Sequence, residues 1–443
     1  MENNANAYDV AVIGGGAAGL IAAIDLARSG LSVVLLEKAH KLGGRAMTVE
    51  KNGARFNLGG HALYLDGEAN AIFREYGLRL DGGPPQTKGV GIWNGKLPPL
   101  PGGAAALLTS KLLSWPGKIE LARIMTKLPK LDTEALSEIS LREWAEREIR
   151  DPMVRNMTYA LCRTSTYNKD IDLPIAGPVL RQLERSLRKD RIRYLDGGWQ
   201  TIVDQLRDLA LRSGATILTG QSVADIEHDG AVLGLRLSDG TTLSVPRVVS
   251  ALAPRETFRL VRDADHTALR GWKEDARPAM AACLDLALRK LPVPGRNLAI
   301  GLDRPIFASN HSFGAKLSDN GDQVVHLVKY NMAGEGNPQE DERILEQAMT
   351  LLHPNWQAEL VGKQFLPTMT VCHDFMHLRR RDRRPGPAVP EIRGLYVAGD
   401  WASHGEWLLD AAAASARRAS KRIIEELARE GTGDAGRALA AHR

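Results

Sequence analysis

A glycine-rich run near the N-terminus has the spacing of a turn that binds the phosphates of a dinucleotide. It follows an apolar stretch at residues 8–13 and precedes residues 20–28, which carry apolar side chains at helical spacing. Such a turn needs one glycine for the tight bend, a second so that the backbone can approach a pyrophosphate, and a third for close packing of helix on strand. The N–H groups that open the helix would face the phosphates. The residues predicted to form this turn are Gly14, Gly15, Gly16, Ala17, Ala18 and Gly19.

An acidic residue follows at the distance that a ribose-binding carboxylate requires. The apolar stretch at residues 32–36 is typical of a second parallel strand, and Glu37 ends it. A carboxylate there can accept hydrogen bonds from ribose hydroxyls, and it would repel a phosphate on that ribose, which disfavours a 2′-phosphorylated cofactor. The βαβ unit alone leaves open a nicotinamide-dependent dehydrogenase and a flavoprotein. The glycines could also form a purely structural turn.

Five stretches of the chain resemble motifs of the flavin amine oxidase and phytoene desaturase superfamily, and they occur in the order expected for that family. The family follows its βαβ unit with a Gly-Gly-Arg group, which here ends in Arg45. It places paired glycines against the flavin ring, as at residues 59–60, although it commonly has an acid where Asn57 occurs. The matching stretches are residues 37–45, 53–61, 194–199, 220–223 and 394–400.

The resemblance implies FAD as the cofactor and assigns residues to its parts. Arg45 would reach the phosphate and ribityl region, Val223 would meet the adenine, and Asp400 would accept a hydrogen bond from a ribityl hydroxyl. A helix that begins near Leu408 would direct its positive end at the flavin pyrimidine edge and stabilise the anionic reduced flavin, unless it is an ordinary packing helix. The cofactor-binding residues carried over from the family are Glu37, Lys38, Gly44, Arg45, Gly59, Gly60, His61, Val223, Gly399, Asp400, Leu408, Leu409 and Ala411.

The FAD is expected to be noncovalent, and no metal is expected. No cysteine lies between residues 400 and 410, where some amine oxidases tether their flavin, and no second glycine-rich nucleotide turn indicates a nicotinamide partner. Cys162, Cys283 and Cys372 are far apart and lack CxxC spacing. This pattern argues against disulfides and zinc, and it favours a reducing compartment.

The expected fold is α/β, with a discontinuous Rossmann-type FAD-binding domain like that of glutathione reductase and an inserted α+β substrate domain. The dinucleotide-related pieces fall in three segments, whereas residues 89–193 favour helices and residues 280–328 favour strands. A chain of 443 residues is long enough for two domains. The predicted FAD-binding domain comprises residues 1–88, 194–262 and 366–443, and the predicted substrate domain comprises residues 89–193 and 263–365.

The resemblance implies an FAD-dependent oxidoreductase that moves a hydride from a substrate C–H bond to flavin N5, with dioxygen or a quinone-like compound as the later acceptor. His61 could orient substrate or shuttle a proton, or be a packed or solvated histidine. Trp407 could belong to an aromatic cage or to the core. Leu408 replaces a tyrosine found in many amine oxidases, which favours C–C oxidation of an apolar substrate but leaves C–N oxidation open. The alternative function is a flavoprotein isomerase or hydratase without net redox change, and a noncatalytic flavin-binding protein is a more distant one.

The composition is that of a globular protein, with 44% hydrophobic residues, 25% charged residues and a net charge of +5. Nucleic acid is not expected as a partner, because aromatic residues are only 5% and no nucleic-acid-binding module occurs. We expect a small-molecule substrate and a monomer or homodimer. Because a strand begins near Tyr8 and no apolar run reaches 18 residues, we expect a cytoplasmic protein without a signal peptide or a spanning helix.

Two further stretches are notable for their charge. Residues 107–131 mix leucines, Trp115 and four lysines. They could lie on an anionic membrane surface, as in related desaturases, or form an amphipathic wall of the substrate domain. The arginine-rich run at residues 377–384 is expected to be a solvated loop.

Overall fold

A parallel five-stranded sheet carries the glycine-rich turn. The computed structural model describes residues 8–380 and 383–441, with side chains up to residue 430. The strands of this sheet lie in the order β19-β13-β1-β2-β9, and every neighbouring pair is parallel. They are β1 (Val10–Ile13), β2 (Val33–Glu37), β9 (Thr216–Thr219), β13 (Val248–Ser250) and β19 (Leu395–Val397).

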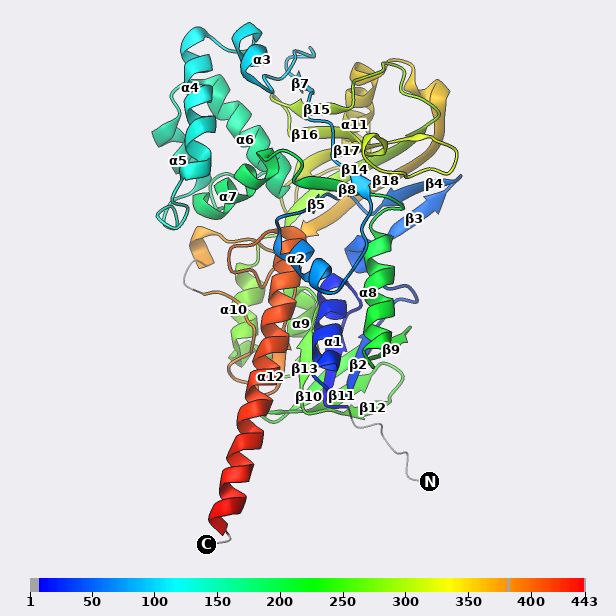
Figure 1. Ribbon diagram of the computed structural model, residues 1–443, viewed down its shortest axis with the longest axis vertical. Coiled ribbons are helices and arrows are strands. Elements are labelled where there is room, and N and C mark those ends of the chain that lie inside the picture. Colours follow the sequence, from blue (N-terminus) through cyan, green and yellow to red (C-terminus); the bar gives the residue numbers. More distant parts are fainter. Residues whose placement is uncertain (1–7, 381–382, 442–443) are drawn as a thin grey trace.

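Both faces of this sheet are covered, which explains why its strands are apolar throughout. Val10 and Val12 face a core shared with helices on one side, and α1 lies between α8 and α12 there (Figure 1). Ala11 and Ile13 face the opposite core, which contains the antiparallel sheet β10-β11-β12 and two short helices. The covering elements are α1 (Ala17–Arg28), α8 (Gln200–Arg212), α12 (Leu408–Ala441), β10 (Val223–His228), β11 (Val232–Leu237), β12 (Thr242–Ser244), α9 (Pro254–Leu260) and α10 (Ala268–Asp275).

A six-stranded sheet forms the other half of the molecule, in the order β18-β14-β17-β16-β15-β7. Its neighbours are antiparallel except for β15 and β7. Along β14 the side chains alternate between two cores, so that Cys283 packs with helices α4–α7, within residues 115–187, and Leu284 packs with α11 (Pro338–Leu352). The strands are β7 (Val90–Ile92), β14 (Ala279–Leu288), β15 (Leu298–Gly301), β16 (Ile306–Asn310), β17 (Gln323–Asn331) and β18 (Leu360–Cys372).

Helices and short strands complete the described part of the chain. The helices beside the six-stranded sheet are α3 (Ala104–Thr109), α4 (Trp115–Lys127), α5 (Leu141–Glu148), α6 (Pro152–Thr166), α7 (Ala176–Leu187) and α11 (Pro338–Leu352). The connecting elements are β3 (Thr48–Lys51), β4 (Ala54–Asn57), β5 (Leu63–Tyr64), α2 (Glu68–Glu75), β6 (Gly82–Gly83) and β8 (Ile192–Leu195). Single 3-10 turns are η1 (Gly44–Ala46), η2 (Leu128–Lys130), η3 (Ala264–His266), η4 (His311–Phe313), η5 (Trp356–Glu359) and η6 (Leu378–Arg380).

The strands from all three predicted cofactor segments meet in the five-stranded sheet. The predicted strands at residues 8–13 and 32–36 and the helix at residues 20–28 are present as β1, β2 and α1. The six-stranded sheet includes β18 as far as Cys372, so it continues beyond the predicted boundary at residue 366. The exact division into domains remains a prediction.

The arginine-rich run at residues 377–384 is partly buried, which corrects the expectation of a solvated loop. Arg380 is only 1% exposed, because it pairs with the carboxylate of Asp374 and donates to the carbonyl oxygen of Trp401 at 3.0 Å. His377 is also fully buried. A guanidinium is tolerated in the interior only with such partners. Residues 381 and 382 lie outside the described residues.

Candidate active site

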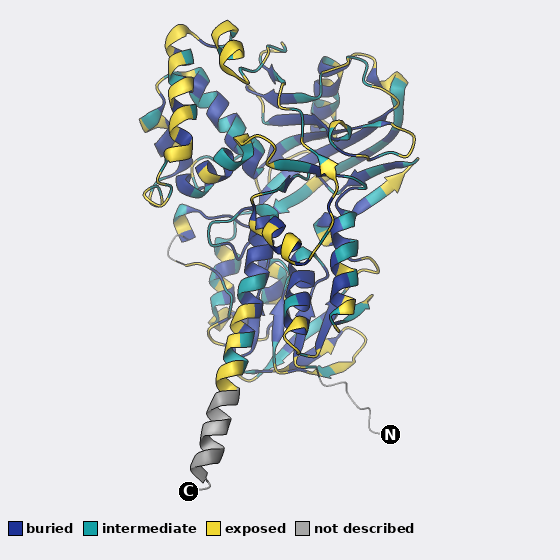
Figure 2. Cartoon of the chain, in the orientation of Figure 1, coloured by how far each residue is buried: buried dark blue, intermediate teal, exposed yellow. Residues whose placement is uncertain are grey.

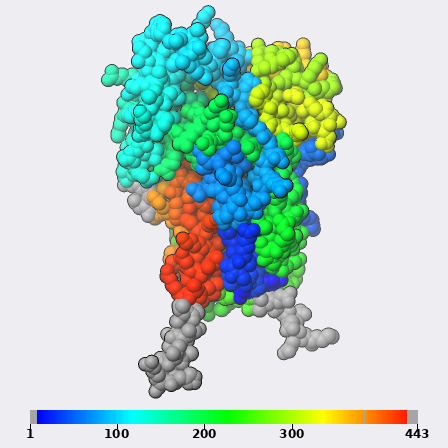
Figure 3. All heavy atoms as spheres, in the orientation of Figure 1, coloured from blue at the N-terminus to red at the C-terminus, as the bar shows by residue number. Residues whose placement is uncertain are grey.

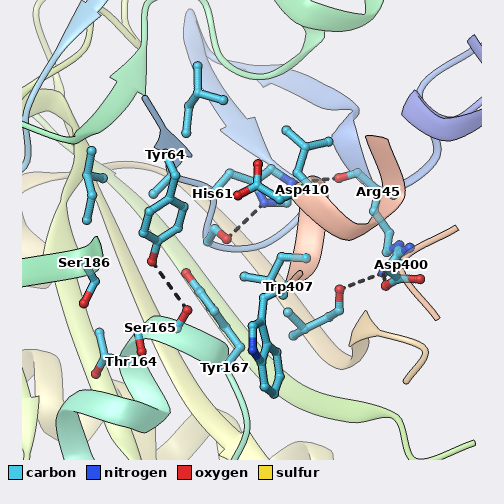
Figure 4. Close-up of a pocket in the computed structure, with 18 of the residues that line it drawn as sticks. Arg45, His61, Tyr64, Thr164, Ser165, Tyr167, Ser186, Asp400, Trp407 and Asp410 are labelled. Atoms are coloured by element: carbon cyan, nitrogen blue, oxygen red, sulfur yellow. Dashed lines mark hydrogen bonds and ion pairs between the residues drawn. The ribbon is translucent and has the colours of Figure 1, made fainter. Parts of the chain in front are cut away.

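One continuous cavity of 1540 Å³ connects the two halves of the molecule. At one end it is lined by the glycine-rich turn after β1, and at the other by side chains of α4, α6, β15 and β16. Figure 4 shows part of this cavity, with Arg45 and Asp400 at one side and Tyr64, Tyr167 and Trp407 projecting into it. The residues of the sequence motifs are thus gathered around one space that is large enough for a cofactor and a substrate.

The glycine-rich turn has the geometry that a pyrophosphate cradle requires. Gly14 has φ +107°, which a side chain would oppose, and a Cβ on Gly19 would lie 1.9 Å from the carbonyl oxygen of Gly14. A Cβ on Gly16 would meet nothing within 4 Å, because this glycine faces the open cavity. The start of α1 adjoins this space and has no acidic side chain in its first turn. Neutral backbone and a positive helix end therefore face the space, which fits the phosphates of FAD.

Glu37 and Val223 line the same end of the cavity. The carboxylate of Glu37 accepts hydrogen bonds from the backbone N–H groups of Gly15 and Ala39, at 2.7 and 2.8 Å. These bonds hold the carboxylate at the end of β2, beside the turn, where the sequence predicted a contact with ribose. Val223 begins β10 and lines the cavity as well.

A buried carboxylate connects two of the predicted cofactor motifs. Asp400 is 3% exposed, and its carboxylate accepts hydrogen bonds from Arg45 Nη1 at 2.6 Å and from the N–H of His373 at 3.0 Å. Although burial opposes ionisation, the positive charge of Arg45 and the contacts with His373 hold the pKa of Asp400 well below its usual range. The pair is therefore charged and lies at the cavity wall, as the ribityl assignment requires.

The Asn57 departure from the family pattern has a local explanation. The side-chain oxygen of Asn57 accepts hydrogen bonds from the Thr48 hydroxyl at 2.8 Å and from the N–H of Trp199 at 2.9 Å. An amide oxygen can accept both bonds without placing a charge in this buried position. Asn57 thus connects the β3–β4 hairpin to the predicted glycine-glycine element before α8.

His61 lies in the cavity wall in a neutral state. Its ring packs on Trp199 at 4.3 Å between centroids, and its Nε2 and Nδ1 atoms lie 2.8 and 3.0 Å from the carbonyl oxygens of Arg45 and Gly60. Burial lowers the pKa of His61 to about 4. A neutral ring carries one N–H, so one of these two nitrogens donates to its carbonyl oxygen, and this bond together with the packing on Trp199 fixes the orientation of the ring.

The start of α12 closes the cavity on another side. Leu408 has φ +56°, an unusual conformation for leucine, and lines the cavity together with Leu409 and Trp407. Trp407 stacks on Phe375 at 5.7 Å and donates to the carbonyl oxygen of Pro178 at 3.2 Å, so it belongs both to the core and to the cavity wall.

Most of the predicted site residues line the cavity. Those that do are Gly14, Gly16, Ala17, Ala18, Glu37, Lys38, Gly44, Arg45, Gly60, His61, Val223, Gly399, Asp400, Trp407, Leu408 and Leu409. Those that do not are Gly15, Gly19, Gly59 and Ala411. Gly19 is too close to the Gly14 carbonyl to reach the cavity, and the position of a Cβ on Gly59 is taken by the sulfur of Met369 at 2.3 Å. These four residues pack beneath the residues that line the cavity.

Several lining residues had no sequence signal. They include Tyr167, His311, Glu256, Arg259, Met369 and His373. None of them lies in a motif, and they come from helices and strands far apart in the chain. No cysteine is among the described residues that line the cavity, which agrees with noncovalent FAD, although that attachment remains a prediction.

Comparison with known proteins places the chain in a family. The sequence profile described as "Flavin containing amine oxidoreductase" matches residues 17–286. The chain belongs to the flavin-containing amine oxidoreductase family. Membership confirms the predicted family, a family of flavin-dependent oxidoreductases, and FAD as its cofactor.

Individual relatives cover less of the sequence. The chain is 46% identical over 79 residues to a flavin-containing amine oxidase of Danio rerio, which is 17% of this chain and 15% of that protein. It is 23% identical over 306 residues to the 4,4′-diaponeurosporene oxygenase of Staphylococcus aureus, which is 61% of each chain. This chain therefore spans less than two thirds of the length of these curated relatives.

Solved structures share the fold over nearly the whole length. An oxidoreductase from Methanosarcina mazei aligns with a TM-score of 0.72 at 20% identity, covering 94% of this chain and 99% of that one. A putrescine oxidase variant aligns with a TM-score of 0.75 at 15% identity, covering 95% and 99%. The mixed α/β fold of flavin amine oxidases is thereby confirmed.

The described residues contain neither a membrane-spanning helix nor a cluster of metal ligands. Among the helices of the described residues, none combines the length and the apolar character that crossing a bilayer requires. In the same residues, histidine, cysteine and acidic side chains form no group of three or more that could bind a metal ion.

Proposed function

We propose that this protein is an FAD-dependent dehydrogenase that oxidises a C–H bond of an extended apolar substrate, with C–C desaturation favoured over amine oxidation. When bound, FAD supplies an acceptor for a hydride. The chain itself would hold the cofactor at the glycine turn and at the Arg45–Asp400 pair. It would also bind the substrate along the apolar end of the cavity.

The observation that carries the proposal is the apolar character of this end. Between residues 100 and 167, no described residue that lines the cavity carries a charge. The apolar side chains there and on the facing strands are Leu100, Leu107, Leu121, Met125, Leu128, Met157, Leu161, Leu298, Ile300, Leu302 and Phe307. The carboxylates of Glu184 and Asp410 also line the cavity, but they are already paired with Arg188 and Arg185. A protonated amine would therefore lose its hydration at the apolar end without gaining a free counter-charge, whereas a hydrocarbon would gain from burial.

The position of the aromatic residues supports the same substrate class. By resemblance to the family, Leu408 replaces a tyrosine that many amine oxidases have, and Trp407 is held by Phe375 and Pro178 as part of a packed wall. The long match to 4,4′-diaponeurosporene oxygenase adds a relative that is named for a polyene. Amine oxidation remains the second candidate, because several structural neighbours are named as amine oxidases.

Anaerobic reduction of the FAD-loaded protein tests the proposal. The holoenzyme is mixed without oxygen with 4,4′-diaponeurosporene in detergent micelles, or with putrescine or cyclohexylamine, and loss of the visible flavin absorbance is followed. We expect reduction by the polyene and none by the amines. Reduction by an amine alone would overturn the apolar assignment. Conversion of the polyene with unchanged flavin absorbance would favour an isomerase or hydratase.

We further propose that the outer faces of α3 and α4 rest on an anionic lipid surface, through which an apolar substrate enters. Leu108, Trp115 and Ile119 are 57%, 64% and 69% exposed. Residues 104–131 contain five basic residues and one acidic residue, and Nζ of Lys118 lies 4.6 Å above the Trp115 ring. Exposed apolar anchors among basic side chains fit an interface with acidic headgroups. In Figures 2 and 3 these helices form an exposed end of the molecule, distant from the five-stranded sheet.

The inner faces of the same helices supply the connection to the cavity. Leu107 of α3 and Leu121 and Met125 of α4 line it. An amphipathic wall and a lipid-facing surface are therefore two sides of the same helices.

Flotation with lipid vesicles tests the membrane proposal. We expect binding to vesicles that contain phosphatidylglycerol, weaker binding to phosphatidylcholine alone, and loss of binding in the double variant Trp115→Ser/Ile119→Ser. Leu233→Ser on β11 removes a similarly exposed apolar side chain elsewhere and serves as the control. Equal vesicle binding by the double variant and the control would refute the proposed contact of α3 and α4 with the membrane.

A further inference from the structure

A row of polar residues crosses the apolar six-stranded sheet. In the strand register, Asp285 of β14 pairs with Gln364 of β18 on one side and with His326 of β17 on the other, and His326 pairs with Ser309 of β16. All four side chains are buried, with exposures between 1% and 5%. Burying a titratable pair in a sheet core is costly, so its presence calls for a role beyond packing.

Hydrogen bonds join the members of this row and determine which ring nitrogen of His326 carries the proton. Its Nδ1 atom lies 2.5 Å from Oδ1 of Asp285, and the other carboxylate oxygen accepts a bond from Gln364 Nε2 at 3.0 Å. Because a carboxylate only accepts, Nδ1 of His326 carries the proton, and Nε2 of a neutral ring presents its lone pair. Nε2 is buried and has no hydrogen-bond partner.

This unpartnered nitrogen points toward the cavity wall beside a tyrosine. A Cβ built on Gly60 would lie 2.4 Å from His326 Nε2 and 2.4 Å from the Tyr167 hydroxyl. Because both atoms lie 2.4 Å from the same point, the distance between His326 Nε2 and the Tyr167 hydroxyl is at most twice that value. A small rotation or one bridging water can therefore connect them by hydrogen bonds. Gly60 has to lack a side chain because these two groups occupy its place.

Tyr167 connects this row of buried polar residues to the cavity. It follows α6 with φ +57°, a conformation that costs energy for a tyrosine, and it lines the cavity that holds His61 and Trp407 (Figure 4). Its ring packs edge-on against Tyr330 at 5.7 Å, which fixes its direction. Burial raises the pKa of Tyr167 well above its usual value, so the hydroxyl keeps its proton until a base accepts it.

We propose that Tyr167, His326 and Asp285 form a proton relay that receives the proton released when the substrate is desaturated. This inference rests on the proposed function. Desaturation breaks two C–H bonds and forms the second bond of a C=C. The hydride leaves with its electron pair to the flavin, and the proton on the neighbouring carbon is transferred to the Tyr167 oxygen. The hydroxyl proton of Tyr167 passes to Nε2 of His326, and the resulting imidazolium remains paired with Asp285. Tyr167 is the catalytic residue, and the other two act through it.

Among the titratable groups around His326, His326 itself is the one suited to accept the proton from Tyr167. They are Asp285 and Cys283 on β14, His311 in η4, His61 in the glycine loop and Tyr167 after α6. Burial lowers the pKa of His311 well below its usual value and that of His61 to about 4, so both rings are neutral at neutral pH. Of the three histidines, His326 has the contact with a carboxylate that stabilises its charged form.

The test uses the FAD-loaded protein and three substitutions. Tyr167→Phe removes one oxygen, and Asp285→Asn presents an amide N–H to Nδ1 and so moves the ring proton to Nε2, where it blocks the relay. Tyr330→Phe is the matched control, because it removes a buried hydroxyl beside Tyr167 that does not line the cavity. We expect the first two variants to slow anaerobic flavin reduction by 4,4′-diaponeurosporene roughly 100-fold or more. Tyr330→Phe should keep the wild-type rate.

A second readout does not depend on turnover. In holoenzyme with ¹⁵N-labelled histidine, the ¹⁵N resonance of His326 Nε2, assigned by its loss in His326→Gln, is recorded at one fixed pH. We expect Tyr167→Phe to shift this resonance, because Nε2 loses the hydroxyl beside it, and Tyr330→Phe to leave it in place. An unchanged Nε2 resonance in Tyr167→Phe, or an unchanged rate of flavin reduction in that variant, would overturn the relay. If the resonance shifts but the polyene does not reduce the wild type, the relay is supported and the proposed substrate is overturned.

Discussion

The pyrophosphate cradle makes a sharp prediction, because Gly16 has room for a side chain only while the cofactor is absent. Its φ of −79° is open to any residue, and a Cβ there would meet nothing within 4 Å. Gly16→Ala and Gly16→Val should therefore fold, with stability within about 1 kcal/mol of the wild type, because a poorer N-cap and a stiffer unfolded chain act in opposite directions.

The same side chains should weaken FAD binding in steps. Each group forced into an occupied space costs about 1–3 kcal/mol, and 1.4 kcal/mol is a tenfold change in affinity. We expect Kd for FAD to rise about tenfold in Gly16→Ala and about 100-fold or more in Gly16→Val.

The assay is quenching of FAD fluorescence on addition of apoprotein, with urea unfolding of the same samples. Gly271→Val is the control, because Gly271 in α10 also has open space around it but does not line the cavity. It should leave Kd unchanged. A folded Gly16→Val protein that binds FAD as tightly as the wild type would refute the placement of the pyrophosphate.

Other predictions concern pH and the shape of the cavity. The folded pKa of His61 is about 4 instead of 6.5, so the stability that depends on its neutral form is full above pH 6.5 and is lost as pH falls toward 4. Urea midpoints should fall less across this range in His61→Gln, and an identical fall would contradict the burial argument. The lowered pKa of Asp400 contributes stability that is full above the usual pKa of an aspartate, about 3.9, and is lost below it, so Asp400→Asn should flatten the most acidic part of the same curve. Leu161→Trp should narrow the apolar end of the cavity and slow flavin reduction by the polyene about tenfold or more while Kd for FAD stays unchanged, and an unaffected reduction rate would place the substrate elsewhere.

The sequence by itself determined the parts of the site whose geometry is local. The glycine turn and Glu37 at the end of β2 were predicted because a strand followed by a tight turn and a helix fixes its own backbone within a few residues. The Gly399-Asp400 pair after β19 was predicted from the resemblance to the family motif. The same local reasoning could not distinguish Gly16, which faces the cavity, from Gly15 and Gly19, which pack behind it.

Only the tertiary structure decided what surrounds the substrate. Asp285, His326 and Gln364 meet because the register of β14, β17 and β18 aligns them, and register between strands far apart in the chain leaves no signal in spacing. The apolar cavity likewise forms from helices and strands that each look like ordinary amphipathic elements. Arg380, in a run that looked solvated, is buried because the fold places Asp374 beside it. Local backbone geometry is encoded by neighbouring residues, whereas a cavity and a buried polar row are produced by contacts that form only when distant segments pack together.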